Sequence, residues 1–215
     1  MKRYKAVIFD LDGTLLDTLT DLAEGTNYAL RVNGFPERTT DEIRRFVGNG
    51  ARKLVERAVP DSQAEAALEQ VRQDFDVYYK VHCKDHTGPY PGIIEMLEEL
   101  ARRGYALGVV SNKPDFAVQE LIPEYFSGLF ASVSGERTGV AKKPAPDLIW
   151  EAMKDLEAGG SDAVYVGDSE VDLEAAANAG IPCISVAWGF KGRKFLEEHQ
   201  AEVIIEKPLE ILNYI

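Results

Sequence analysis

Cysteine is scarce in this chain of 215 residues, which contains only two, Cys83 and Cys183. Two thiols so far apart cannot form the disulfide framework of a small secreted domain, and we expect reduced thiols in a cytoplasmic protein. A chain of this length buries enough apolar surface to fold without disulfides or structural metals. It has room for one large domain, or for a core with a smaller insert.

Long apolar runs and an excess of positive charge are missing too. No stretch approaches the roughly 20 apolar residues of a membrane-spanning helix, and the N-terminus lacks the apolar h-region of a signal peptide. The formal net charge is −12, since 36 Asp and Glu outnumber 24 Lys and Arg. Nucleic acids and anionic membranes favour a basic face, so we expect neither as a partner. An anionic substrate would need locally clustered Lys and Arg. We expect a monomer or homodimer.

Two aspartates follow the first apolar run of the chain. Ala6–Phe9 has the character of a buried parallel strand, so Asp10 and Asp12 are expected where the strand ends and the chain turns at Gly13. Carboxylates this close repel each other unless a cation holds them, and Mg²⁺ accepts such oxygen ligands. A carboxylate beside a metal-neutralised phosphate can attack phosphorus and form an aspartyl-phosphate. For this motif alone, a turn with two capping aspartates is the simpler alternative.

The order of the remaining patterns predicts an α/β fold, a doubly wound parallel sheet with a Rossmann-like core. From Pro91 onward, helical and strand patterns alternate, as is typical of such a sheet. The strands expected after the first are 106–110, 130–133, 163–166, 184–186 and an edge strand at 203–205. Short apolar runs bounded by Gly and Pro carry this assignment.

Between the first strand and the rest, only helical patterns occur. A capping box at Thr39–Glu42 opens one helix, Gly48–Gly50 interrupts it, and a second capping box at Ser62–Glu65 opens a long one. We therefore predict a core domain of residues 1–16 and 87–215 and an inserted helical-bundle cap of residues 17–86.

Further polar groups fall at the expected ends of later strands. Ser111 and Asn112 follow one strand, Asp168 follows another, and Lys143 precedes a helix. Ligands of open α/β sheets bind outside the carboxyl ends of the strands, so these groups should converge on the aspartate pair. Taken singly, each has an ordinary explanation as a helix cap or a surface charge. Together they indicate one site.

These motifs, in this order, resemble the haloacid dehalogenase superfamily. The matching segments are Phe9-Asp10-Leu11-Asp12-Gly13-Thr14-Leu15, Val110-Ser111-Asn112, Lys143-Pro144, and Gly167-Asp168-Ser169 followed by Asp172. The resemblance covers nearly the whole chain, and the helical insert is similar to the superfamily's mobile cap. D-L-D-G-T-L-L-D-T, V-G-N-G-A and V-G-D-S-x-x-D-L-x-A-A are most similar to the phosphoglycolate phosphatase-like members.

The resemblance implies the covalent chemistry of a phosphoric monoester hydrolase. Asp10 would be the nucleophile and a Mg²⁺ ligand, and Asp12 the general acid and base. The backbone carbonyl of Asp12 and the side chain of Asp168 would complete the protein ligands to Mg²⁺. The namesake dehalogenases, which work without metal, lack the second aspartate of the first motif, so its presence favours phosphatase chemistry.

The same resemblance implies how the phosphoryl group is held. Ser111 and Lys143 would bind the transferring phosphoryl oxygens, where charge dominates the reaction. Asn112 would position the phosphoryl group or Asp10. Asp172 would either tune the metal site or pair with Lys143.

The only clue to the substrate lies in the insert. Arg52 and Lys53 follow Gly48–Gly50 at a new helix N-terminus, where free amides and the helix dipole favour an anion. An arginine can also bind a carboxylate through two hydrogen bonds. We predict that Arg52 and Lys53 bind a short substrate with phosphate at one end and carboxylate at the other, as in 2-phosphoglycolate. A solvated Arg-Lys pair explains the pattern equally well.

Other functions are compatible with parts of this pattern. A β-phosphoglucomutase-like phosphosugar mutase, or a phosphatase for another small phosphometabolite, would share the four motifs. A receiver-type signalling domain also phosphorylates an aspartate beside Mg²⁺. Its acceptor, however, follows a later strand, in a shorter chain without a long helical insert.

Overall fold

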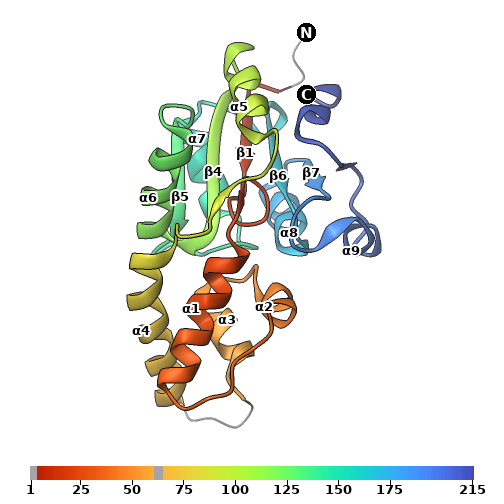
Figure 1. Cartoon of the computed structure of the whole chain (residues 1–215). Coiled ribbons are helices and arrows are strands. Elements are labelled where there is room, and N and C mark those ends of the chain that lie inside the picture. Colours follow the sequence, from red (N-terminus) through yellow and green to blue (C-terminus); the bar gives the residue numbers. More distant parts are fainter. Residues whose placement is uncertain (1–3, 61–64) are drawn as a thin grey trace.

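The computed structural model describes residues 4–60 and 65–215 and contains a six-stranded sheet in the order β5-β4-β1-β6-β7-β8 (Figure 1). Its strands are β1 (Ala6–Phe9), β4 (Ala106–Pro114), β5 (Ser132–Glu136), β6 (Ala163–Gly167), β7 (Cys183–Val186) and β8 (Ile204–Ile205). Every neighbouring pair in this sheet is parallel. The predicted α/β fold with a parallel sheet is confirmed, including an edge strand near the C-terminus.

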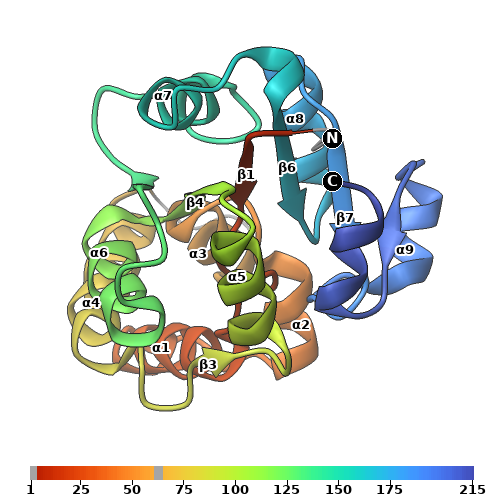
Figure 2. The ribbon, with the colours of Figure 1, turned by 90° about the horizontal axis from the view of Figure 1, so that it is seen from above.

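Helices cover both faces of the sheet (Figure 2). Val7 and Phe9 of β1 belong to one apolar cluster, with α5 (Ile93–Arg102) and α6 (Asp115–Phe126). Ala6 and Ile8 of the same strand belong to another, with α7 (Asp147–Asp155) and α8 (Glu170–Ala179). Successive side chains of a strand point to opposite faces, so a strand buried on both sides must be apolar throughout. The remaining core elements are η1 (Gly160–Asp162), α9 (Gly192–Glu198) and η2 (Pro208–Asn213).

The insert is a group of packed helices lying beyond the carboxyl ends of the strands (Figure 1). They are α1 (Leu19–Val32), α2 (Thr40–Phe46), α3 (Ala51–Ala58) and α4 (Glu65–His82). The capping box at the start of α2 is confirmed, since the Thr39 N–H donates to Glu42 Oε2 at 2.8 Å and the Glu42 N–H donates to Thr39 Oγ1 at 3.3 Å. The predicted box at Ser62–Glu65 lies largely outside the described residues.

A short ribbon joins the two crossings between core and insert. β2 (Leu16–Asp17) pairs antiparallel with β3 (Gly88–Pro89). The buried carboxylate of Asp21 accepts hydrogen bonds from the Thr87 N–H at 2.9 Å and the Thr87 hydroxyl at 2.7 Å. The prediction that the insert is helical from Asp17 onward is wrong at Asp17, which belongs to β2. A two-residue strand is too short to produce a periodic pattern.

The strand that carries Ser111 is longer than predicted. β4 continues to Pro114 instead of ending at Val110, with a register irregularity between these residues. Likewise, the strand expected at 130–133 runs over Ser132–Glu136. Polar residues normally end a strand pattern, but Ser111 and its two successors are buried beneath the insert.

Among the described residues, none of the helices is long and apolar enough to span a membrane.

Candidate active site

Asp10 lies directly after β1, at the carboxyl edge of the sheet. Its carboxylate Oδ1 accepts the N–H of Leu11 at 2.7 Å and lies 2.9 Å from Lys143 Nζ. Burial raises the pKa of Asp10 to about 7, against the lowering effect of the Lys143 ammonium. One lysine is therefore insufficient to keep this carboxylate fully ionised at neutral pH, and additional positive charge would favour its ionised form.

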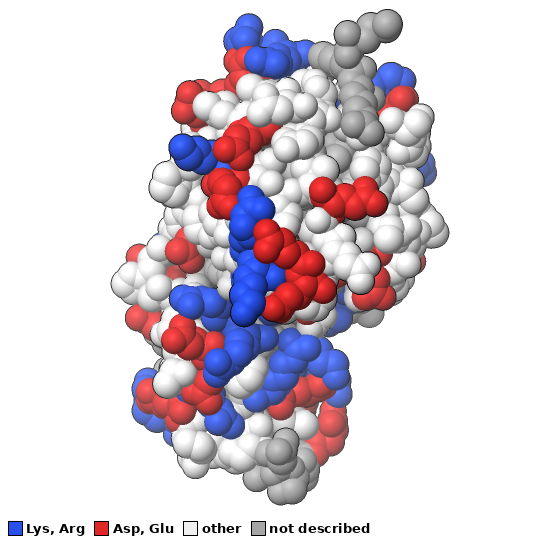
Figure 3. Space-filling view, turned by 90° about the vertical axis from the view of Figure 1, so that its right-hand side faces the viewer, with Lys and Arg blue, Asp and Glu red and all other residues white. Residues whose placement is uncertain are grey.

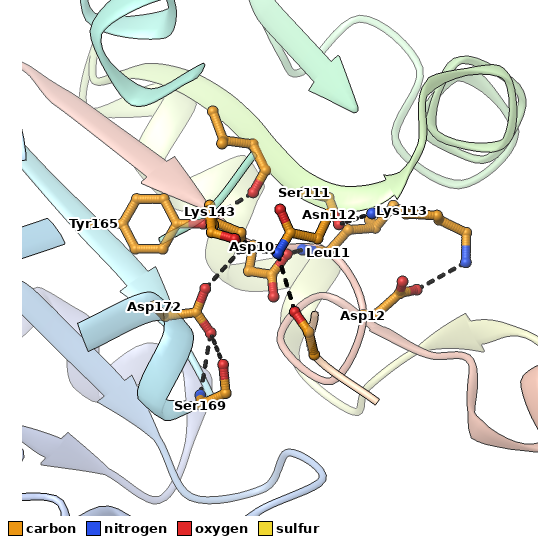
Figure 4. Close-up of polar contacts among 12 residues, drawn as sticks. Asp10, Leu11, Asp12, Ser111, Asn112, Lys113, Lys143, Tyr165, Ser169 and Asp172 are labelled. Atoms are coloured by element: carbon orange, nitrogen blue, oxygen red, sulfur yellow. Dashed lines mark hydrogen bonds and ion pairs between the residues drawn. The ribbon is translucent and has the colours of Figure 1, made fainter. Parts of the chain in front are cut away.

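Lys143 is fixed by several buried partners. Besides Asp10, its ammonium lies 2.7 Å from Asp172 Oδ1 and donates to the Tyr165 hydroxyl at 2.8 Å. That hydroxyl in turn donates to the Val110 carbonyl at 2.9 Å. Burial alone would lower the pKa of Lys143, but Asp10 and Asp172 raise it above its usual value. The ammonium therefore stays charged and points at Asp10 (Figure 4).

Asp172 is anchored at the start of α8. Its Oδ2 accepts the Ser169 N–H at 3.1 Å and the Ser169 hydroxyl at 2.7 Å, while Oδ1 binds Lys143. A Cβ on Gly167 would lie 2.3 Å from the Asp172 Cγ, so a side chain at that position would collide with the carboxylate. Asp172 thus pairs with Lys143, and it also lies within reach of the Asp10 and Asp168 carboxylates, so both predicted roles fit its position.

Three buried carboxylates form a cluster with the geometry of a cation site. Asp10, Asp168 and Asp172 each offer an oxygen within 4.8 Å of the others. Burial and the negative charges of Asp172 and Asp10 raise the pKa of Asp168 well above its usual value. A Cβ on Gly13 would lie 2.6 Å from Asp168 Oδ2, and one on Gly189 would lie 2.5 Å from it, so glycine permits this close approach. One lysine, Lys143, contacts two of these three carboxylates, so the cluster keeps an excess of negative charge, and its oxygen donors fit Mg²⁺.

Asp12 turns away from Lys143 and binds a different lysine. Its Oδ1 lies 2.9 Å from Lys113 Nζ, and that ammonium also donates to the Tyr79 hydroxyl of α4 at 2.6 Å. The Lys113 side chain is 1% exposed. Figure 4 separates the two pairs, with Lys143 and Asp172 on one side of Asp10 and Lys113 and Asp12 on the other.

Asn112 connects the core to the insert. Its amide nitrogen donates to the Lys143 carbonyl at 2.9 Å and to the Gly48 carbonyl at 3.1 Å. Ser111, on the same strand, is buried and lines the same cavity as Asp10. The sequence-predicted core residues thus come together between sheet and insert.

A cavity lies between the core and the insert. It is lined on the core side by Asp10, Asp12, Ser111, Asn112, Lys113, Asp168 and Lys191, and on the insert side chiefly by Leu22, Val47, Leu54, Phe75 and Tyr79.

Arg52 and Lys53 do not line this cavity. Arg52 binds Glu56 at 3.0 Å and Glu65 at 2.5 Å, and Lys53 binds Glu56 at 2.5 Å, all on the exposed surface. On α3 the cavity is lined by Ala51 and Leu54, which are three residues apart and share a face. The intervening Arg52 and Lys53 fall on other faces of the helix.

Lysines other than the predicted ones reach the cavity. Lys113 directly follows Asn112, so its position in the Ser-Asn-Lys segment was the available signal. Lys191 lines the cavity as well, and its ammonium donates to the Val47 carbonyl at 3.3 Å. Figure 3 shows Lys and Arg gathered in a band across the junction between core and insert, despite the negative net charge of the chain.

Comparisons with known proteins identify the family of the chain. The sequence profile described as haloacid dehalogenase-like hydrolase matches residues 7–186. A phosphoglycolate phosphatase of Pseudomonas syringae pv. syringae is 34% identical over 206 residues, covering 93% of this chain and 76% of that protein. One from Vibrio parahaemolyticus is 31% identical over 218 residues, covering 98% of this chain and 96% of its own.

Solved structures give the same result. A candidate phosphoglycolate phosphatase from Lactobacillus delbrueckii subsp. bulgaricus superposes with a TM-score of 0.93 at 37% identity, covering 98% of this chain and 97% of that one. A predicted phosphoglycolate phosphatase from Haemophilus somnus superposes with a TM-score of 0.91 at 29% identity, covering 99% and 98%. The receiver-domain alternative is incompatible with this membership. The chain belongs to the haloacid dehalogenase-like hydrolase family and is a phosphatase of its phosphoglycolate phosphatase-like group.

Proposed function

We propose that this phosphatase hydrolyses 2-phosphoglycolate through an aspartyl-phosphate on Asp10, with Mg²⁺ as cofactor. The observation that carries the proposal is the position of Asp10, which lines the cavity, contacts the Lys143 ammonium at 2.9 Å and offers an oxygen within 4.8 Å of one from the buried Asp168. The names of relatives covering more than nine-tenths of the chain support the substrate. Mg²⁺ would be held by Asp10, Asp168 and the backbone carbonyl of Asp12, and when bound it neutralises charge on the phosphoryl group.

The first half of the reaction transfers the phosphoryl group to the protein. A carboxylate oxygen of Asp10 attacks phosphorus while the bond from phosphorus to the leaving oxygen breaks. Asp12 gives its proton to that leaving oxygen, so the alcohol departs neutral. Lys143 and Ser111 hold the phosphoryl oxygens, and Asn112 orients the group for attack.

The second half releases phosphate. Asp12, now ionised, takes a proton from a water molecule, which attacks the phosphorus of the aspartyl-phosphate. The bond between phosphorus and the Asp10 oxygen breaks, so inorganic phosphate leaves and the carboxylate is restored. A mutase would instead have to return the phosphoryl group to a sugar hydroxyl.

We further propose that residues 17–86 act as a closing cap over a core of residues 1–16 and 87–215. The bonds Asn112–Gly48, Lys113–Tyr79 and Lys191–Val47 would hold the cap shut. Closure would exclude bulk water while the phosphoryl group is transferred, and the β2–β3 ribbon would be the hinge.

Free Cys83 and Cys183 are consistent with a cytoplasmic enzyme.

The test is a panel of phosphate monoesters, assayed for release of inorganic phosphate with Mg²⁺ and ranked by kcat/KM. We expect 2-phosphoglycolate to rank above glycerol phosphates and p-nitrophenyl phosphate. A higher rank for another metabolite would keep the phosphatase chemistry and replace the substrate. Rapid conversion of β-glucose 1-phosphate to glucose 6-phosphate, with a bisphosphate primer and little free phosphate, would establish the mutase alternative.

A further inference from the structure

Lys113 is a buried cation that is not among the residues proposed to bind the phosphoryl group, Lys143 and Ser111. Its ammonium binds one partner from the core, Asp12 at 2.9 Å, and one from the cap, Tyr79 at 2.6 Å. An ammonium carries three N–H donors, and the described part of the chain occupies two of them. The Tyr79 hydroxyl accepts from Lys113, and within residues 4–60 and 65–215 no group accepts the proton of that hydroxyl. Two donors at this point of the cavity are therefore available to a ligand.

The position of Lys113 relative to Asp12 indicates what that ligand is. In the proposed reaction Asp12 protonates the leaving oxygen, so its carboxylate must reach that atom. Lys113 binds the same carboxylate, so its ammonium lies on the side of the leaving group, whereas Lys143 lies on the side of the nucleophile. In 2-phosphoglycolate the carboxylate carbon is two bonds from the leaving oxygen, close enough for a neighbouring ammonium to reach by one hydrogen bond.

The other cations near the cavity are less suited to this role. Lys143 is engaged by Asp10 and Asp172. Arg52 is paired with glutamates on the surface. Lys191 is only partly buried and donates to main-chain carbonyls of the cap.

The rest of the leaving-group side is apolar. Leu22, Leu54 and Phe75 line the cap side of the cavity. Hydroxyl groups of a sugar would lose hydrogen bonds to water against such a surface without replacement. A short acid, by contrast, exposes only a methylene to this wall and directs its single charge to Lys113.

We propose that Lys113 determines substrate specificity, and that its ammonium and the Tyr79 hydroxyl together bind the carboxylate of a short phosphorylated 2-hydroxy acid. The inference rests on the proposed function, because it assigns the leaving-group side from the role of Asp12. It gives the carboxylate-binding role predicted for Arg52 and Lys53 to a buried residue of the core. Two donors on one carboxylate also require a closed cap, since Tyr79 belongs to α4.

The experiment compares two substrates of nearly equal size, 2-phosphoglycolate and its carboxamide, which lacks the negative charge. For wild type we expect kcat/KM to favour the acid. In Lys113→Met this acid-to-amide preference should fall about 10- to 100-fold, as for loss of a hydrogen bond to a charged group. Tyr79→Phe removes only a hydroxyl, and the preference should fall about 3- to 10-fold. Lys113→Arg should retain most of the preference.

Matched variants and both substrates distinguish the possible failures. Lys84→Met removes a surface lysine paired with Glu120 at 2.9 Å and should leave the preference unchanged. An equal loss on acid and amide in Lys113→Met would mean that Lys113 acts only through Asp12, which overturns the inference. Loss of the preference in Arg52→Met but not in Lys113→Met would overturn it too. In both cases 2-phosphoglycolate remains the substrate. Absence of wild-type turnover on 2-phosphoglycolate, with turnover of p-nitrophenyl phosphate, would instead refute the proposed substrate and the inference with it.

Discussion

The Lys143 ammonium lies 2.7 Å from the Asp172 carboxylate, and both side chains are almost fully buried. This pair holds the lysine against Asp10 while the capping contacts of Ser169 hold the carboxylate. Asp172→Asn should therefore disturb the orientation of Lys143 without removing a group that touches substrate. We expect activity to fall about 10- to 100-fold, the range for supporting partners of a metal or catalytic site. Steady-state kinetics beside a thermal melt will check this, and an unchanged kcat in a folded variant would contradict it.

Asp10→Asn should abolish turnover while the fold is retained. The amide is a poor nucleophile and a weaker metal ligand, so the loss should be at least about 10³-fold. Phosphate release by the purified variant, with circular dichroism as the control for folding, measures this loss. Turnover within about tenfold of wild type would rule out Asp10 as the nucleophile.

Asp12→Asn should reduce the rate about 10²- to 10⁴-fold, because no group remains to give and retrieve the proton. Esters with good leaving groups need less protonation, so the burst with p-nitrophenyl phosphate should suffer less than the burst with 2-phosphoglycolate. Rapid-mixing measurements of both bursts decide the point. Equal losses would show that Asp12 is not the general acid.

Chelation of divalent metal should silence the enzyme, and Mg²⁺ should restore activity better than Ca²⁺. Both ions take oxygen ligands, but Ca²⁺ prefers more ligands at longer distances. A titration of activity against each ion in chelator-treated protein measures the difference. Full activity in excess chelator would remove Mg²⁺ from the account.

The affinity for Mg²⁺ should fall as the pH drops below about 7. Without metal, burial raises the pKa of Asp10 from 3.8 to about 7, so the folded protein binds a proton there that the unfolded chain has already lost. The free energy of unfolding of the metal-free protein therefore decreases as the pH rises from about 4 through 7. Below about pH 7, a cation that binds Asp10 must also displace its proton. One unit below that pKa, binding should weaken about tenfold for each proton displaced. Calorimetric titrations at pH 6 and pH 8 test this, and equal affinities would contradict it.

Much of this molecule was predictable from sequence because its signals are local. The apolar run before Asp10 and the alternation of patterns after Pro91 define a parallel sheet, and the structure confirms it. Parallel strands bring their carboxyl ends to one edge, so residues distant in sequence, such as Asp10 and Asp168, could be grouped from sequence position alone.

The contacts between core and cap could not be predicted in this way. Lys113 lies on a strand that the sequence pattern predicted to end at Val110, and its partner Tyr79 lies on a helix of the insert. No periodicity specifies how two such units dock, because that contact depends on burial from both sides. The prediction that Arg52 binds the substrate relied on its charge and on its position near a helix N-terminus. In the structure, α3 is oriented so that Leu54 lines the cavity and Arg52 does not.

Transfer of the phosphoryl group to Asp10 can be observed by trapping the covalent intermediate. Enzyme mixed with 2-phosphoglycolate carrying radiolabelled phosphorus should be quenched in acid within a single turnover, digested and mapped by mass spectrometry. We expect a labelled, base-sensitive acyl phosphate on the peptide that contains Asp10, and no label in Asp10→Asn. Release of phosphate from wild type with no labelled protein at any quench time, or with label on a different residue, would contradict it.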